Sequence, residues 1–215
     1  MARVTRTPSR TLLAALAAIL LLPAVAMGQE AAPSMPEDPR AARFKEVERG
    51  LFTGFEVGYL GLFKTPLADA AKFPFAVGGG GNASGMLVGA NLGYDVSSRV
   101  AVSLFALGGN ARASVSYGAF SVFVGGGDLR VALLGASDKY GVERFHLYLH
   151  GRAGALLTSP EGLLGHTDVY LAGGPGVEYV THLRHFAVGL ATDAVYLAKV
   201  GAAGVAVTPT VSYTF

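Results

Sequence analysis

A set of ionisable side chains between residues 56 and 193 could form ion pairs or carry protons, because its members alternate with apolar neighbours and can therefore face one common side. In the stretch RFHLYLHGRAGALL (144–157), Arg144 and Arg152 have one parity and Leu147 and Leu149 have the other. Alternation with a period of two is typical of a strand that faces two different environments. The charged set comprises Glu56, Asp128, Arg130, Arg144, His146, His150, Arg152, Asp168, Glu178 and Asp193.

The mixed signs of these side chains favour a neutralising, hydrogen-bonded network if they share one interior. Unpaired charge in a protein interior carries a large desolvation penalty, so oppositely charged groups are expected to pair. The alternative interpretation is a path for protons or ions along the same groups. Both interpretations require strands that turn these residues to one side.

His146 and His150 form the only histidine pair in the charged set. Four residues along a strand span about 13 Å, so the two imidazoles cannot share one metal ion without ligands from elsewhere. We therefore expect no metal site and no cofactor.

Ser159, His166 and Asp168 bring a hydroxyl, an imidazole and a carboxylate into one short segment. This combination could serve nucleophilic catalysis, but catalytic roles depend on geometry, and no nucleophile motif surrounds Ser159. The run Gly78–Gly81 resembles a phosphate-binding loop only superficially, because no Lys-Ser or Lys-Thr follows it. We therefore expect a protein that is not an enzyme.

The composition narrows the class of protein. The 215 residues are 51% hydrophobic and 15% charged, include 30 glycines and no cysteine, and carry a formal charge of +2. Such a small charge gives no argument for nucleic acid, and disulfides are excluded. Residues 1–28 have the basic start, apolar stretch and small residues of a cleavable signal peptide, and 29–49 predict a periplasmic linker.

Eight strand-like runs follow residue 50, and no segment shows a helical period. Their expected ranges are 50–63, 84–96, 99–107, 120–135, 144–157, 167–180, 185–197 and 204–215. The connections alternate between long or glycine-rich (64–83, 108–119, 158–166, 198–203) and tight (97–98, 136–143, 181–184). This asymmetry is typical of transmembrane barrels. Residues 50–215 are therefore predicted to be all-β, forming an eight-stranded antiparallel up-and-down transmembrane β-barrel.

Alternation alone does not decide whether the apolar face meets lipid or an interior. A water-soluble barrel would turn its apolar face inward. The export signal, strands long enough for the roughly 9–11 residues that cross a bilayer, and aromatic residues near the strand ends favour lipid outside. The predicted interior then holds the charged set and many glycines.

The last strand, TPTVSYTF (208–215), alternates up to the final aromatic residue. An open sheet edge in lipid would leave costly unpaired backbone groups, so this strand is expected to pair with the first and close the barrel. Tyr213 and Phe215 also resemble the end of bacterial outer-membrane barrels, and this resemblance implies that they are an assembly signal read by the barrel-assembly machinery.

The stretch ERGLFTGFEVGYLGLF (48–63), with a short charged segment and a signal peptide before it, resembles the adventurous gliding motility proteins of myxobacteria, of the CglE type. The whole of 50–215 also resembles small eight-stranded outer-membrane barrels. The narrower resemblance implies an outer-membrane part of a gliding apparatus.

The expected function is that of a non-enzymatic structural or coupling subunit of envelope-spanning machinery in the outer membrane. Its expected partners are outer-membrane lipid, the barrel-assembly machinery and envelope or motility-complex proteins, with no nucleic acid. One alternative is a narrow channel or a port for apolar solutes. Another is an enzyme that modifies outer-membrane lipid.

Overall fold

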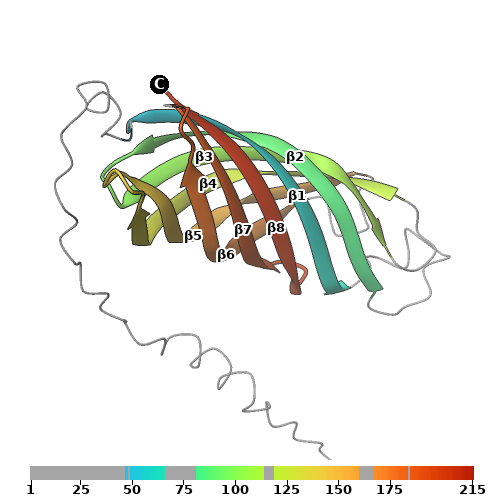
Figure 1. Cartoon of the computed structure of the whole chain (residues 1–215). Coiled ribbons are helices and arrows are strands. Elements are labelled where there is room, and N and C mark those ends of the chain that lie inside the picture. Colours follow the sequence, from blue (N-terminus) through green and yellow to red (C-terminus); the bar gives the residue numbers. More distant parts are fainter. Residues whose placement is uncertain (1–46, 48, 66–80, 114–118, 160–166, 184) are drawn as a thin grey trace, which may run out of the picture. The chain divides into compact units, whose positions relative to one another are not determined.

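Eight strands form one closed antiparallel barrel (Figure 1). This computed structural model describes residues 47, 49–65, 81–113, 119–159, 167–183 and 185–215. The strands are β1 (Leu51–Thr65), β2 (Gly81–Asp95), β3 (Val100–Ala113), β4 (Ala119–Ser137), β5 (Glu143–Ser159), β6 (Thr167–Val180), β7 (Phe186–Leu197) and β8 (Ala202–Thr214). Each strand pairs with its neighbours in sequence, and β8 pairs with β1, so the predicted fold class is confirmed.

The described residues include no helix that is long and apolar enough to cross a membrane. The predicted signal peptide lies outside the described residues, as does most of the predicted linker. Of residues 29–49, the structure describes Val47 and Arg49.

The two ends of the barrel differ in their connections. The N-terminus of β1, the C-terminus of β8 and the turns 96–99, 138–142 and 181–185 share one end, which we call the turn end. At the other end, the loop end, β1 ends at Thr65, β3 at Ala113, β5 at Ser159 and β7 at Leu197, and β2, β4, β6 and β8 begin. The two ends differ less in the length of their connections than the sequence predicted, because several strands extend into stretches that were predicted to be loops.

The third strand shows why. The glycine-rich start of the predicted loop 108–119 belongs to β3, which continues to Ala113. A Cβ atom on Gly109 would lie 1.9 Å from the backbone oxygen of Met86. Glycine is therefore present here because β2 and β3 approach closely, and the prediction that it begins a loop was wrong.

Barrel closure accounts for the ordered C-terminal strand. Phe52 pairs with Thr214, and the pairing of β1 with β8 continues to Phe63 and Ala203. The backbone N–H of Phe215 donates to the carbonyl of Leu51 at 2.9 Å. The last residue therefore takes part in sealing the sheet, as the sequence predicted.

Large apolar side chains cover the outside of the barrel. Leu104 is 69% exposed, Leu134 66% and Met86 60%, and similar residues occur on all eight strands. The predicted interior set agrees with this arrangement on β1, where Phe55 points outward and its neighbour Glu56 is fully buried. The described barrel thus exposes an apolar surface and encloses many of its charged side chains.

The interior has two layers, and the sequence predicted only one of them. Towards the turn end the interior is polar. Towards the loop end it is an apolar layer of buried side chains: Leu60, Leu62, Leu87, Phe105, Leu107, Phe120, Val122, Val124, Leu156, Tyr170, Val195 and Leu197. The expectation of an interior of polar residues and glycine was therefore wrong for this half of the barrel.

A pair of inward glycines lies where the two layers meet. Gly126 on β4 faces Gly154 on β5, and a Cβ on Gly126 would lie 2.1 Å from the Ala153 carbonyl oxygen. A Cβ on Gly154 would lie 2.1 Å from the Gly125 carbonyl oxygen. The two strands can approach this closely only because neither residue has a side chain.

Candidate functional site

The centre of the polar layer is an ion pair across the lumen. Both terminal nitrogens of Arg152 on β5 donate to the carboxylate of Glu56 on β1, at 2.9 and 3.0 Å. The Glu56 side chain is fully buried and that of Arg152 is 4% exposed. Arg152 Nε also donates to Asp128 Oδ2 at 3.3 Å, and Asn91 Nδ2 donates to Glu56. The guanidinium therefore bridges carboxylates from two strands.

His150 extends this group towards β7. Its Nδ1 lies 3.3 Å from Asp128 Oδ1, and its Nε2 lies 2.6 Å from Asp193 Oδ1. A carboxylate thus lies beside each ring nitrogen, and of these two contacts only that of Nδ1 with Asp128 has hydrogen-bond geometry. Glu56, Asn91, Asp128, His150, Arg152 and Asp193 form one connected group, which we call the central cluster.

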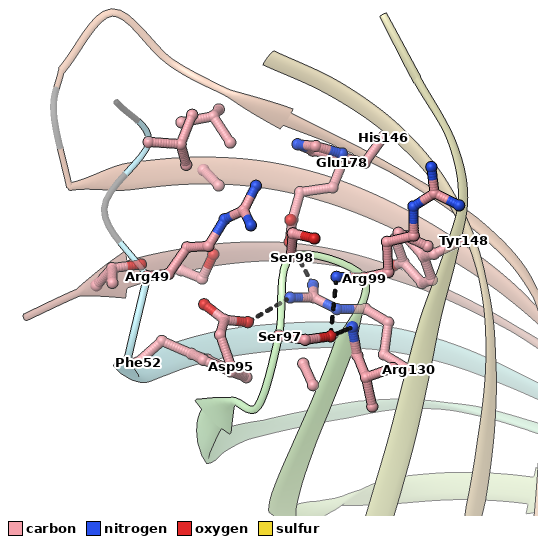
Figure 2. A pocket seen from close by; sticks show the side chains of 18 of the residues that line it. Arg49, Phe52, Asp95, Ser97, Ser98, Arg99, Arg130, His146, Tyr148 and Glu178 are labelled. Atoms are coloured by element: carbon pink, nitrogen blue, oxygen red, sulfur yellow. Dashed lines mark hydrogen bonds and ion pairs between the residues drawn. The ribbon is translucent and has the colours of Figure 1, made fainter. Parts of the chain in front are cut away.

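A second group lies closer to the turn end and is centred on Arg130. Its guanidinium forms an ion pair with Glu178 and lies 3.6 Å from Asp95 Oδ1. The aromatic rings of Phe52 and Tyr148 lie 5.5 and 5.3 Å from it. Arg130 is thus fixed by two carboxylates and two ring faces (Figure 2).

Two cavities accompany these groups. The mouth cavity, of about 70 Å³, opens at the turn end and is lined by residues that include Arg49, Phe52, Asp95, Arg99, Arg130 and Glu178. An inner cavity of about 40 Å³ reaches the central cluster and shares Arg130 and Tyr148 with the mouth cavity. Polar cavities of this size hold a few water molecules. The polar layer therefore has room for water on the turn-end side.

The structure places the other predicted interior residues at three different positions. Arg144 lies at the turn end, where its Nε donates to Asp138 at 2.7 Å and its Nη1 donates to the Thr181 carbonyl at 2.9 Å. It therefore ties two turns together. His146 lines the mouth cavity. Asp168 is at the opposite, loop end of the barrel.

Asp138 organises the turn between β4 and β5. Its carboxylate accepts hydrogen bonds from Arg144 and from the backbone N–H groups of Tyr140 and Val142. Desolvation acts to raise the pKa of Asp138, but these hydrogen bonds outweigh it and hold the pKa below its usual range. The turn is thus stabilised by an ionised carboxylate.

Asp168 has a structural role in the described residues. Its carboxylate accepts hydrogen bonds from the backbone N–H groups of Val169, Lys199 and Val200, at 2.6, 2.7 and 3.0 Å. It therefore fastens the turn between β7 and β8 to the start of β6. These three donors occupy both carboxylate oxygens.

Replacing Asp168 by alanine is expected to lower the free energy of unfolding by about 1–3 kcal/mol, because three partly buried backbone donors would lose their acceptor. The measurement is the urea midpoint of the barrel refolded in lipid vesicles. Ser159→Ala, at the same end but exposed, should change stability by less than about 0.5 kcal/mol. Equal stability of the two variants would contradict this role of Asp168.

The residues considered for catalysis or metal binding do not form a site among the described residues. Ser159 is exposed on the barrel surface, whereas Asp168 is 1% exposed and points inward; His166 lies outside the described residues. Of the run Gly78–Gly81, only Gly81 is described, as the first residue of β2. The described part of the chain has no group of three or more His, Cys, Asp or Glu residues that could hold a metal ion.

Tyr213 and Phe215, predicted as an assembly signal, belong to an aromatic group at the turn end. The Tyr213 ring lies 5.2 Å from Phe215, 5.1 Å from Phe186 and 5.1 Å from the imidazole of His185. Recognition by assembly machinery stays a prediction.

Three polar residues of the site were not among the predicted set: Asn91, Asp95 and Tyr148. Asn91 and Asp95 have the parity of the interior face of β2, and Tyr148 lies between His146 and His150 on that of β5. Parity could therefore have found all three. The residues that these three side chains contact could not be found in this way, because those contacts depend on how far each strand is shifted along its neighbour.

Comparison with known proteins supports the fold. Neisserial surface protein A has a TM-score of 0.57 and 14% identity, with 77% of this chain and 99% of that chain covered. Ail of Yersinia pestis (TM-score 0.46, 11% identity, 78% and 100% covered) and OprG of Pseudomonas aeruginosa (0.48, 15%, 80% and 99%) also match. No protein-family description matches the chain, and no curated protein does. The chain therefore has the fold of a small eight-stranded outer-membrane barrel.

Proposed function

We propose that this chain is a non-enzymatic β-barrel of the bacterial outer membrane that serves as a structural or coupling subunit of envelope-spanning machinery. The observation that carries the proposal is the combination of an apolar outer surface with a lumen filled by side chains. The first suits a position in lipid, and the second suits a role other than transport.

The outer surface supports a membrane position. Monomeric soluble proteins rarely expose continuous apolar patches larger than a few hundred Å². Here large apolar side chains are exposed on every strand. The strands have 12 to 19 residues, enough for the roughly 9–11 that a tilted strand needs to cross a bilayer. With short turns on the periplasmic side, the turn end would face the periplasm.

The lumen argues against the channel and the apolar-solute port. An eight-stranded barrel has an interior just wide enough to be filled by side chains. Leu60 and Leu156 are 1% exposed and Leu197 is fully buried, so they leave little space at the loop end. The Glu56–Arg152 pair crosses the middle of the lumen. Water would reach the central cluster from the turn end and stop there.

The first test combines location with conductance. The protein is expected in the outer-membrane fraction, with a gel mobility that shifts on boiling, and without stepwise conductance when reconstituted in planar bilayers. A pore-forming porin reconstituted in the same way provides the positive control. Steady conductance would contradict the sealed lumen, and a soluble periplasmic protein would contradict the membrane position.

The coupling role rests on the predicted linker 29–49 and on the resemblance to gliding motility proteins. If the linker holds a periplasmic partner, its deletion should release that partner and leave the barrel assembled. The measurement is co-purification after cross-linking in intact cells, with heat-dependent gel mobility as the assembly control. Unchanged co-purification would remove the linker from this role.

The lipid-modifying enzyme is disfavoured by the separation of its candidate groups. Ser159 faces outward. Both oxygens of the Asp168 carboxylate already accept hydrogen bonds from backbone N–H groups of the β7–β8 turn and of Val169. A catalytic acid must be free to orient a histidine.

A further inference from the structure

We propose that the mouth cavity is the docking site for a carboxylate-bearing segment of a periplasmic protein. This proposal rests on the proposed function, which places the turn end in the periplasm, and it names the chemistry of the partner. Its basis is the distribution of charge around the cavity (Figure 2).

The carboxylates among the described lining residues are already paired. Asp95 and Glu178 both interact with Arg130 at its floor. Arg49 and Arg99 also line the cavity, and both residues are exposed. Among the described residues, no carboxylate lies within 4 Å of either guanidinium, so the charges left for a ligand are positive.

The net charge selects the kind of anion. Among the described residues, three arginines and two carboxylates line the cavity, which leaves one formal positive charge when the histidines are neutral. A single carboxylate matches this charge. A phosphate dianion would exceed it and would also approach the Asp95 and Glu178 carboxylates.

The shape and walls favour a peptide side chain over a free ion. The cavity of about 70 Å³ is large enough for a carboxylate with part of its aliphatic stem. Phe52, Val180 and Phe186 contribute apolar walls that the stem can contact, and Ser98 adds a hydroxyl. A guanidinium binds a carboxylate through two parallel N–H donors. An acidic residue beside apolar ones would satisfy each of these features.

The test uses a fluorescent synthetic peptide of alternating glutamate and alanine, with a glutamine–alanine peptide as its neutral counterpart. Binding to the refolded full chain in detergent is followed by fluorescence anisotropy at low and high salt. We expect saturable, salt-sensitive binding of the glutamate peptide alone. The Arg49→Gln/Arg99→Gln double variant should bind it about tenfold more weakly, as expected for the loss of two partly exposed charge pairs.

Lys139→Gln is the matched control. Lys139 is an exposed cation of the same end that contacts the Tyr140 ring and does not line the cavity. Its substitution should leave peptide binding unchanged. Equal weakening by Lys139→Gln would show a diffuse charge effect and overturn the proposal, as would undiminished binding by the double variant.

A second experiment adds inorganic phosphate, at the same concentration as the peptide, to the peptide-bound barrel and measures whether the peptide is displaced. Displacement of the peptide by phosphate would assign the cavity to small anions and overturn the proposal. Each variant is first checked for heat-dependent gel mobility and for absence of conductance. Absence of peptide binding by a folded, sealed barrel would therefore refute the docking site and leave the proposed membrane role intact.

Discussion

Replacing Arg152 by methionine is expected to lower the free energy of unfolding by about 3–5 kcal/mol, because it removes one partner of a buried ion pair. Methionine retains most of the volume of the side chain, so lost packing is a minor part of the effect. Glu56 would remain fully buried with Asn91 as its donor, and Asp128 would keep only His150. Both carboxylates would then lie in a lumen that has lost a guanidinium.

The measurement is the urea midpoint of the barrel in lipid vesicles, followed by far-UV circular dichroism and by the gel mobility of unboiled samples. Arg112→Met, an exposed arginine near the loop end of β3, is the matched control and should change stability by less than about 0.5 kcal/mol. The Glu56→Gln/Arg152→Met double variant should be more stable than Arg152→Met alone, because no unpaired Glu56 charge remains. A loss below about 1 kcal/mol in Arg152→Met would mean that water already solvates the cluster.

Replacing Gly126 by alanine should also destabilise the barrel, by about 1–3 kcal/mol or more, because the added methyl group meets backbone atoms. Its Cβ would lie 2.1 Å from the Ala153 carbonyl oxygen and 2.6 Å from the Gly154 Cα. Backbone atoms of a paired strand cannot rotate away as a flexible side chain can. The pairing of β4 with β5 would have to open locally.

The next residue in the chain provides the control for this substitution. Gly127 points outward, and its Cβ would have no neighbour closer than the Ser103 carbonyl oxygen at 3.9 Å. Gly127→Ala should therefore refold with the yield and urea midpoint of the natural protein. If the two alanine variants behaved alike, backbone flexibility and not the close approach of the strands would explain the glycine at position 126.

The sequence predicted the faces of the strands well, because parity is a local property. Residues on one face recur every second position, so Glu56 and Asp193 could be placed in the interior without knowing the register. Their partners could not be predicted in this way. Glu56 and Arg152 are 96 residues apart and meet across the lumen, at heights that depend on the shift between successive strands.

The apolar layer escaped prediction for a different reason. In β1, Leu60 and Leu62 are buried in the lumen while Tyr59 and Phe63 face outward, so apolar residues occupy both faces. Alternation disappears when both environments are apolar. The sequence therefore could not distinguish an apolar interior from a lipid-facing surface in this half of the barrel.

The pairing of β1 with β8 has a consequence for how the chain reaches its folded state. The two strands come from opposite ends of the barrel sequence, and their contacts form only after a very large loop has been closed. Until then both strands have open edges that could pair with other chains. Folding should accordingly be slow and cooperative, as expected for a topology dominated by distant contacts. A chain shortened by its last strand would retain those open edges, so the final residues protect the folding chain from pairing with other chains as well as completing the finished barrel.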